Sequence, residues 1–446
     1  METEKFGYVD SQGNEIAYMA IGGARHDLLL VPGGFGSFDV LLDEPARGRF
    51  FAPLAEFARI ITFDQRGMGM SSRSAAPAAV EDQMADVEAV LNVAGSTRVA
   101  LMASGAGAAM AAMFAATYAA RVSHLILFHG QARTTRTEGY EWAMSAAERQ
   151  SRLIEPLLAD WSRGDLLAHM FFPVLAAQDP RVARLADRFQ RQSGTPAEVR
   201  PHWELSEQLD VREILSEVQA PTLVIDRPAA TEFDSRHAVY LAEHIPDARL
   251  LELPGRDTIF LGDGVEALIA AIEEFIAGTD RRPDASRTLS TVAFTDIVGS
   301  TAKAETLGDA GWRKLLERHD RLTRELVSEH GGRPIKSTGD GFLATFDGPA
   351  RAVRCTAALA ARVPELGIEL RSGVHTGEVE LRGGDIAGIA VHIGARIAAL
   401  AGPGEVLTSS TVRDLAVGSG IDFTDRGWHQ LKGVAESWRL YGASLG

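Results

Sequence analysis

The stretch VALMASGAGAAM, residues 99–110, decides the fold of the first part of the chain. A short apolar run of β type is followed by a glycine-containing turn and then by an alanine-rich segment. The uncharged region continues to Ala120, but its Ala, Gly, Ser and Met content is too weakly apolar to favour a membrane helix. The stretch therefore predicts a buried strand, a tight turn and a helix.

Similar β-type runs lie on both sides of this stretch, from Phe6 to about Ile276. IITFD (60–64), HLILF (124–128) and PTLVI (221–225) alternate with longer helical segments, which is typical of a parallel sheet covered by helices. The region from about 133 to 218 has helical periodicity and few strand-like runs, so it predicts a helical lid. We expect an α/β domain over residues 1–277.

A polar segment, GTDRRPDASR (278–287), reads as a linker to a second domain over residues 288–446. Beyond it, STVAFTD predicts a strand, 304–329 a helix, PIKSTGDGFLATF a hairpin and 350–363 another helix. IELRSGVHTGEVEL then predicts a strand and 389–401 a helix. This order predicts an α+β domain with a ferredoxin-like βαββαβ core.

Composition narrows the class of function. The chain has 446 residues, 46% of them hydrophobic, and a formal net charge of -15, which argues against nucleic acid and anionic membrane surfaces as partners. The single cysteine, Cys355, fits a reducing compartment, and the N-terminus has no apolar segment typical of a signal peptide. We expect a cytoplasmic protein.

Two aspartates of the second domain carry the strongest chemical signal. Asp296 ends an apolar strand in FTDIVGST, and Asp340 lies in the glycine-flanked turn of IKSTGDGF. Backbone N–H groups of Gly299, Ser300 and Thr301 could hold phosphate at a helix start. Either aspartate alone would more often be a turn or cap residue. Together they suit paired Mg²⁺ or Mn²⁺ ions beside a nucleotide.

Residues 288–441 resemble the class III adenylyl and guanylyl cyclase catalytic domain. The resemblance is carried by five segments in the family's order: FTDIVGST, IKSTGDGF, GVHTGEV, DIAGIAVHIGAR and RGWHQLKG. It implies that Asp296, Asp340 and the carbonyl of Ile297 bind two Mg²⁺ or Mn²⁺ ions per site. It also implies a homodimer, because in this family the metal aspartates of one domain face the base and transition-state residues of another.

By the same resemblance, Lys336 and Asp385 select the base. Lysine can donate to N1 and aspartate can accept from the N6 amino group, so the pair predicts adenine and hence ATP as substrate. The GGD sequence at 383–385 is also found in diguanylate cyclases, but Ile386 and Ala387 replace the Glu-Phe expected there. We therefore discount that interpretation.

Three further residues match functional positions of the cyclase family. Arg396 matches the transition-state arginine, and Lys432 matches a lysine that binds the terminal phosphates. His392, one helical turn before Arg396, stands where the family usually has asparagine, so activity is expected to be reduced or sensitive to pH.

The first domain resembles the α/β-hydrolase fold through LLLVPGGFG, FDQRGMGMSS, VALMASGAGAAM and ELPGRDTIF, but its catalytic triad is missing. Gly105, Ala230 and Thr258 occupy the expected positions of the nucleophile, acid and base, so serine-hydrolase chemistry cannot operate there. A shifted site using Ser104, Asp234 and His237 is an alternative.

We therefore favour an adenylate cyclase with a non-catalytic, hydrolase-like regulatory domain that retains a pocket for a small apolar ligand. Two other interpretations stay open. The chain could be a serine esterase or lipase with a degenerate cyclase domain, or a ligand-sensing protein without activity.

Overall fold

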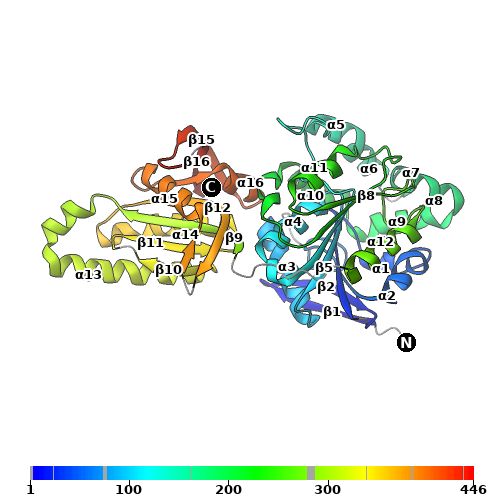
Figure 1. Ribbon diagram of the computed structural model, residues 1–446, viewed down its shortest axis with the longest axis horizontal. Coiled ribbons are helices and arrows are strands. Elements are labelled where there is room, and N and C mark those ends of the chain that lie inside the picture. Colours follow the sequence, from blue (N-terminus) through cyan, green and yellow to red (C-terminus); the bar gives the residue numbers. More distant parts are fainter. Residues whose placement is uncertain are drawn as a thin grey trace. The chain divides into compact units, whose positions relative to one another are not determined.

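The computed structural model describes residues 4–23, 25–73, 78–161, 163–278, 287–337, 339–382, 385–434 and 436–445. It divides the chain into two compact units, Met1–Asp284 and Ala285–Gly446, each built on its own eight-stranded sheet (Figure 1). Residues 279–286 of the linker expected at 278–287 lie outside the described residues. No described helix combines the length and the apolar character that crossing a membrane requires.

The sheet of the first unit has the strand order β1-β2-β4-β3-β5-β6-β7-β8. β3 to β8 run parallel, whereas β1 pairs antiparallel with β2 and β2 antiparallel with β4. The strands are β1 (Glu4–Ser11), β2 (Asn14–Ile21), β3 (His26–Val31), β4 (Ala58–Phe63), β5 (Val99–Ser104), β6 (Val122–Phe128), β7 (Thr222–Asp226) and β8 (Arg249–Glu252).

Helices connect these strands and bury the apolar faces of the sheet. They are α1 (Phe38–Leu41), α2 (Ala52–Ala55), α3 (Val80–Val93), α4 (Gly107–Thr117), α11 (Arg236–His244) and α12 (Val265–Gly278). Every residue of α4 is buried, and the helix contacts β5 and β6. VALMASGAGAAM thus forms the strand, turn and helix predicted from it, at the centre of the unit.

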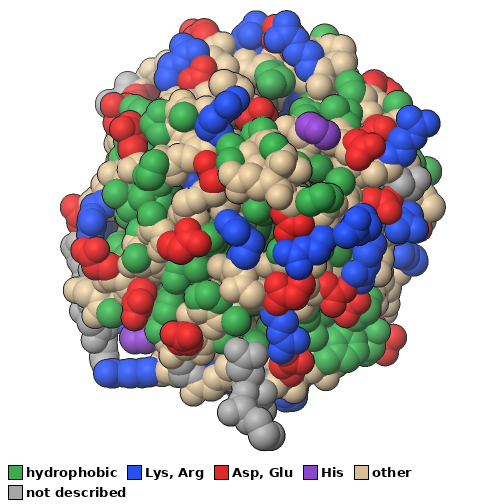
Figure 2. Space-filling model, turned by 90° about the vertical axis from the view of Figure 1, so that its right-hand side faces the viewer, with side chains coloured by type: hydrophobic (Ala, Val, Ile, Leu, Met, Phe, Trp, Pro, Cys, Tyr) green, Lys and Arg blue, Asp and Glu red, His purple; other side chains and the backbone are tan. Residues whose placement is uncertain are grey.

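Most of the chain between β6 and β7 is helical and forms the lid. Its helices are α5 (Ala146–Arg149), α6 (Glu155–Ala159), α7 (Asp165–Phe171), α8 (Pro173–Gln178), α9 (Arg181–Ser193) and α10 (Pro196–Gln208). Figure 2 shows a face of the molecule on which Lys and Arg side chains lie interspersed with Asp and Glu. Ion pairs such as Arg188 with Asp43 (2.5 Å) and Arg200 with Glu155 (2.6 Å) tie lid arginines to acidic neighbours.

The second unit has the strand order β10-β11-β9-β12-β14-β16-β15, and β13 pairs with β12. The strands are β9 (Arg287–Ile297), β10 (Arg333–Ser337), β11 (Gly341–Phe346), β12 (Leu370–Arg382), β13 (Asp385–Ala387), β14 (Val406–Ser409), β15 (Ile421–Gln430) and β16 (Ser437–Leu445). The helices are α13 (Ser300–Glu329), α14 (Pro349–Arg362), α15 (Ile389–Leu400) and α16 (Ser410–Leu415).

The predicted fold classes are confirmed for both units, and two details of the second differ from expectation. α13 begins at Ser300, directly after the glycine turn, rather than at 304, and it is kinked at Gly308, whose φ is +65°. Three further strands, β14 to β16, extend the expected core on the β12 side.

Candidate active site

The two predicted metal aspartates lie at the same end of neighbouring strands. Asp296 on β9 pairs with Gly341, the first residue of β11, and Asp340 immediately precedes that strand. The backbone N–H of Ile297 donates to the Asp340 carbonyl at 3.1 Å. This cross-strand register brings the FTD and GDG segments together at the start of α13.

Sequence reasoning missed a third residue at this end of the sheet, Arg371 on β12. Its Nε donates to Asp296 Oδ2 at 2.9 Å, and its Nη2 also bonds that oxygen. The two residues are register partners across β9 and β12, and both are partly exposed. The sequence did predict that LRSG, which contains Arg371, forms a strand. Pairing of that strand with the one that carries Asp296 was the only signal that could have revealed the contact.

The donor set fits a hard divalent cation. Asp296 and Asp340 offer carboxylate oxygens, Ile297 offers a backbone carbonyl beside them, and Asp296 already accepts a cationic partner in Arg371. Within the described ranges, no group of three or more His, Cys, Asp or Glu side chains is placed to hold a metal. A cation here would therefore depend on phosphate oxygens for part of its coordination.

The start of α13 offers backbone donors next to the aspartates. Gly299 has φ +65° and precedes the helix without a side-chain cap, and Ser300 and Thr301 form its first turn. The first N–H groups of a helix have no partner within it and lie at the positive end of its dipole. The arrangement suits an anionic phosphate.

The structure brings together Lys336 and Asp385, the pair expected to select the base. Lys336 Nζ donates to the two carboxylate oxygens of Asp385 at 2.8 and 2.6 Å. The hydrogen bonds from Lys336 and from the Ile386 N–H hold the pKa of Asp385 below its usual value. Both side chains are about half exposed, so a ligand can reach them from solvent.

Arg396 and His392 share the exposed face of α15, while Ile393 and Ile397 on its other face are buried. The helix lies very close to the sheet, because a Cβ on Gly373 of β12 would stand only 2.2 Å from the Ala398 nitrogen. Among the described residues, neither Arg396 nor His392 hydrogen-bonds to the aspartate pair. One unit therefore does not join the two halves of the expected site.

Lys432 lies in the turn between β15 and β16 and is exposed. Like Arg396, it has no ion pair with any described residue. Its role as a phosphate ligand stays a prediction.

In the first unit, the structure keeps the backbone of a nucleophile elbow without its nucleophile. Gly105 follows β5 with φ +53°, and a Cβ placed on it would meet nothing within 4 Å. Gly107 packs tightly instead, since its Cβ would stand 2.8 Å from the Pro32 carbonyl oxygen. The position expected to carry the attacking hydroxyl therefore has space for a side chain but carries none.

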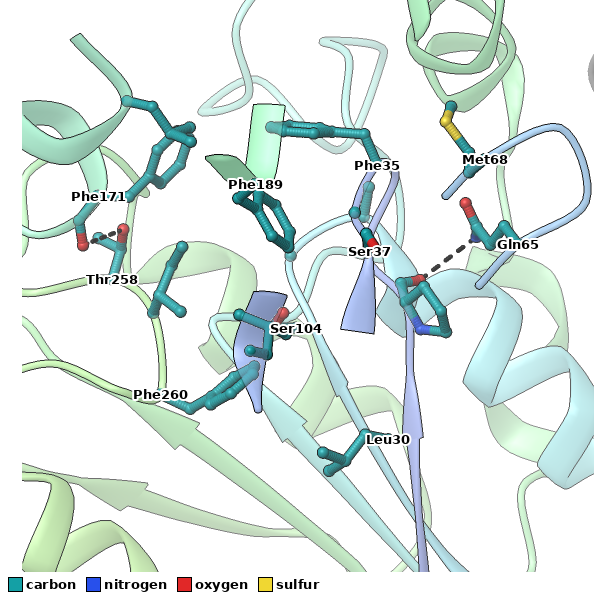
Figure 3. A pocket seen from close by; sticks show the side chains of 18 of the residues that line it. Leu30, Phe35, Ser37, Gln65, Met68, Ser104, Phe171, Phe189, Thr258 and Phe260 are labelled. Carbon is teal, nitrogen blue, oxygen red and sulfur yellow. Dashed lines mark hydrogen bonds between the residues drawn. The ribbon is translucent and has the colours of Figure 1, made fainter. Parts of the chain in front are cut away.

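The other two expected triad positions also lack catalytic side chains. Ala230 is buried, and its N–H donates to the Arg227 carbonyl at 2.9 Å. Thr258 lines the same cavity as Gly105, and its N–H and hydroxyl both donate to the Phe171 carbonyl of the lid, at 2.9 and 3.4 Å (Figure 3). Thr258 therefore fastens the lid to the sheet.

The alternative triad is not assembled. His237 Nδ1 lies 2.7 Å from the Tyr140 hydroxyl and His237 Nε2 lies 3.4 Å from Gln131, so both ring nitrogens face other partners. Asp234 bonds Arg236. Burial lowers the pKa of His237 to about 4. Ser104 thus has no base beside it in this geometry.

Two family models match the chain. Residues 28–255 match the alpha/beta hydrolase fold and residues 285–442 match the adenylate and guanylate cyclase catalytic domain. A putative adenylate cyclase 3 of Rhizobium meliloti (strain 1021) is 37% identical over 164 residues, 33% of this chain and 27% of that protein. An adenylate cyclase of Glutamicibacter nicotianae is 31% identical over 121 residues, 27% of this chain and 30% of that protein. The matches thus span about a third or less of these relatives.

Solved structures resemble the first unit in fold. An esterase from Exiguobacterium antarcticum is 18% identical with a TM-score of 0.52, covering 61% of this chain and all of that one. The enol-lactonase from Burkholderia xenovorans LB400 is 20% identical with a TM-score of 0.50 and the same coverage. The chain therefore belongs to the alpha/beta hydrolase fold family and carries, after that unit, an adenylate and guanylate cyclase catalytic domain.

Proposed function

We propose that the chain is an adenylate cyclase, which converts ATP to 3',5'-cyclic AMP and pyrophosphate. The observation that carries the proposal is the register of β9 and β11, which holds Asp296 and Asp340 side by side next to the open start of α13. Relatives named adenylate cyclases support the same choice.

The chain's own groups divide the work of the reaction. The ribose 3'-hydroxyl attacks the α-phosphorus and loses its proton, while the bond from that phosphorus to the departing pyrophosphate breaks. Two bound Mg²⁺ or Mn²⁺ ions would supply Lewis-acid stabilisation. Asp296, Asp340 and the Ile297 carbonyl would hold them, and the first N–H groups of α13 would orient the triphosphate.

Base choice falls to Lys336 and Asp385. Their hydrogen bonds to each other support the proposal that the two side chains act together on one base edge. Lysine would donate to adenine N1 and aspartate would accept from the N6 amino group, whereas guanine presents the opposite pattern. This complementarity supports ATP over GTP.

We further propose that two copies of the chain complete the site. Arg396 and His392 lie on an exposed helix face, and in the described part of the chain neither hydrogen-bonds to the aspartate pair of its own unit, which supports a role at the nucleotide of a second copy. ATP as substrate and a single buried thiol fit a reducing, cytoplasmic location. The hydrolase-like unit would regulate the cyclase without catalysis of its own.

The test is cyclic nucleotide formation by the purified full-length chain with ATP or GTP and Mg²⁺ or Mn²⁺. We expect cyclic AMP, and we expect Asp296→Ala and Asp340→Ala to lower its rate more than about 100-fold. Asp320→Ala is the matched control, since Asp320 lies on α13 and bonds Arg324 away from the aspartate pair. Full activity in Asp340→Ala would overturn the metal-site assignment.

Base selection has its own test. Replacing both Lys336 and Asp385 with alanine should lower the preference for ATP over GTP at least about tenfold, because paired polar groups that recognise a base are lost. The ratio of kcat/KM for the two nucleotides measures the effect. An unchanged ratio would assign base choice to other residues.

A further inference from the structure

The hydrolase-like unit contains a cavity of about 220 Å³ under its lid. Its floor is formed where β3 and β5 end, and its roof by residues of α7, α9 and α10 (Figure 3). The cyclase chemistry does not use it. The cavity is therefore a candidate binding site for a separate ligand.

Most of the wall is apolar, and much of it is aromatic. Phe35 contacts Trp203 and Phe189 at ring-centroid distances of 5.2 and 5.5 Å, and Phe171 and Phe260 line the cavity near Thr258 (Figure 3). Such a wall favours a ligand whose body is apolar and partly aromatic.

The floor offers a small number of polar groups. The Ser104 hydroxyl has no hydrogen-bond partner among the described residues, although Ser104 lines the cavity. Gln131 lines it too. Of its two side-chain polar atoms, only Nε2 has a partner, His237 at 3.4 Å. Gly105 lines the cavity beside them, and a Cβ on it would meet nothing within 4 Å, so these groups fit one compact head that accepts or donates a hydrogen bond.

The charged residues of the wall already have partners. Arg149 Nε lies 3.5 Å from Glu207 Oε1, and its Nη2 donates to Ser206 at 3.4 Å. Asp64 accepts the N–H groups of Phe38 and Met70, each at 2.8 Å. An anionic ligand would lose its hydration without gaining a dedicated counter-charge, because Arg149 already pairs with Glu207. Asp64 is held by neutral donors, and burial raises its pKa to about 7, so it is a weak counter-charge for a cation.

We infer that this cavity binds an uncharged molecule with an apolar, partly aromatic body and one carbonyl or hydroxyl head, which lies beside Ser104 and Gln131 and is not cleaved. Cleavage lacks its nucleophile at Gly105 and its base at Thr258. The inference rests on the proposed non-catalytic role of this unit and is independent of the chemistry of the cyclase unit.

Calorimetric titration of the full-length chain with matched compounds tests the inference. 4-Phenyl-2-butanone has the aromatic body and a carbonyl head, butylbenzene lacks the head, and 3-phenylpropanoate carries a charge in its place. We expect saturable binding of the ketone at one site, three- to tenfold weaker binding of butylbenzene and at least tenfold weaker binding of the carboxylate. The ester 2-phenylethyl acetate should bind and be recovered intact.

Variants locate the head group. Ser104→Ala combined with Gln131→Leu should remove the advantage of the ketone over butylbenzene and leave butylbenzene binding unchanged. Ser216→Ala, which alters an exposed serine of the same unit outside the cavity, should change neither affinity. If the double variant unfolds, Ser104→Ala alone should lower the affinity advantage of the ketone over butylbenzene at least twofold.

Three outcomes would overturn the inference. They are no saturable binding of the ketone, tighter binding of the carboxylate, and cleavage of the ester that Ser104→Ala abolishes, which would restore the esterase interpretation. Cyclic AMP formation by the same preparations is measured in parallel. Active cyclase without ketone binding would reject the cavity assignment alone, and ketone binding without cyclase activity would reject the proposed function alone.

Discussion

At the scale of single residues, burial decides protonation in the hydrolase-like unit. His237 is 5% exposed, and burial lowers its pKa to about 4. At neutral pH the imidazole is therefore uncharged, and its Nδ1 lies within hydrogen-bonding distance of the Tyr140 hydroxyl. The ring nitrogens of this histidine have Tyr140 and Gln131 as partners rather than Ser104.

This state predicts how stability depends on pH. The pKa of His237 is lower in the fold than in the unfolded chain, so the unfolded chain binds more protons between about pH 6.5 and pH 4. The contribution of His237 is thus present above pH 6.5 and is lost as pH falls to about 4. The difference in unfolding free energy between the native chain and His237→Gln, measured by urea denaturation, should shrink across that window. A constant difference would contradict the prediction.

Individual residues also show what the sequence could and could not predict. Asp296 and Asp340 could be proposed as metal ligands from their strand-end and turn positions, and Lys336 and Asp385 as the base-selecting pair from the family resemblance. The Arg371–Asp296 pair could not, since it joins residues 75 positions apart through cross-strand register. Gly105 could be assigned from pattern, but its open surroundings depend on side chains from several elements.

At the scale of elements, α15 depends on glycines where it crosses the sheet. A Cβ on Gly394 would stand 2.8 Å from Val292 Cγ2, and one on Gly373 would meet the backbone at Ala398. Only hydrogen at these positions allows the helix to lie so close. The position of Arg396 and His392 is set by this contact.

Gly373→Ala should therefore push α15 away from β12. We expect a loss of about 1–3 kcal/mol of stability from overpacking and a fall in cyclase activity, as Arg396 moves with its helix. Gly402→Ala is the control, because a Cβ there makes ordinary contact with Glu405 at 3.4 Å. Thermal unfolding and cyclic AMP formation measure the two effects, and wild-type values in Gly373→Ala would contradict the close-packing argument.

A second element-level contact closes the lid. Asp257, fully buried, accepts the N–H groups of Val174 and Leu175 at the start of α8, at 2.7 and 3.1 Å, and the N–H of Asp263 at 2.8 Å. The loop that would carry a hydrolase base thus holds the lid instead. The sequence did not reveal this role because nothing local distinguishes a capping aspartate from a solvated one.

Asp257→Ala should release the lid. Three N–H groups, one buried and two part-buried, would lose their acceptor, so we expect at least about 2 kcal/mol of destabilisation and faster amide hydrogen exchange in α8. Asp179→Ala removes a partly exposed lid aspartate that bonds Arg181 and should cost far less stability. Equal exchange in the two variants would contradict the proposed fastening.

At the scale of the whole molecule, each unit has hydrophobic cores of its own. One large core cluster draws its buried residues from positions 17–276, and the clusters of the second unit draw theirs from positions 292–440. The division between α/β and α+β halves was visible in the sequence, because strand and helix signals change their order after the polar segment at 278–287.

Separate cores predict two thermal transitions in scanning calorimetry. A ligand that binds one folded unit stabilises that unit by mass action. An ATP analogue with Mn²⁺ should raise one transition, and 4-phenyl-2-butanone should raise the other. A single transition that both ligands shift equally would mean that the units unfold together.

The open elbow at Gly105 also makes the chain convenient for spectroscopy. The only native thiol, Cys355, is buried, and burial raises its pKa to about 12, so it reacts slowly with maleimides and iodoacetamides. A Gly105→Cys variant would place a second thiol where its Cβ meets no neighbour, with some backbone strain because φ is +53°. Its rate of reaction with a small chromogenic thiol reagent should fall when a ligand fills the cavity, so labelling kinetics would report occupancy while the cyclase turns over.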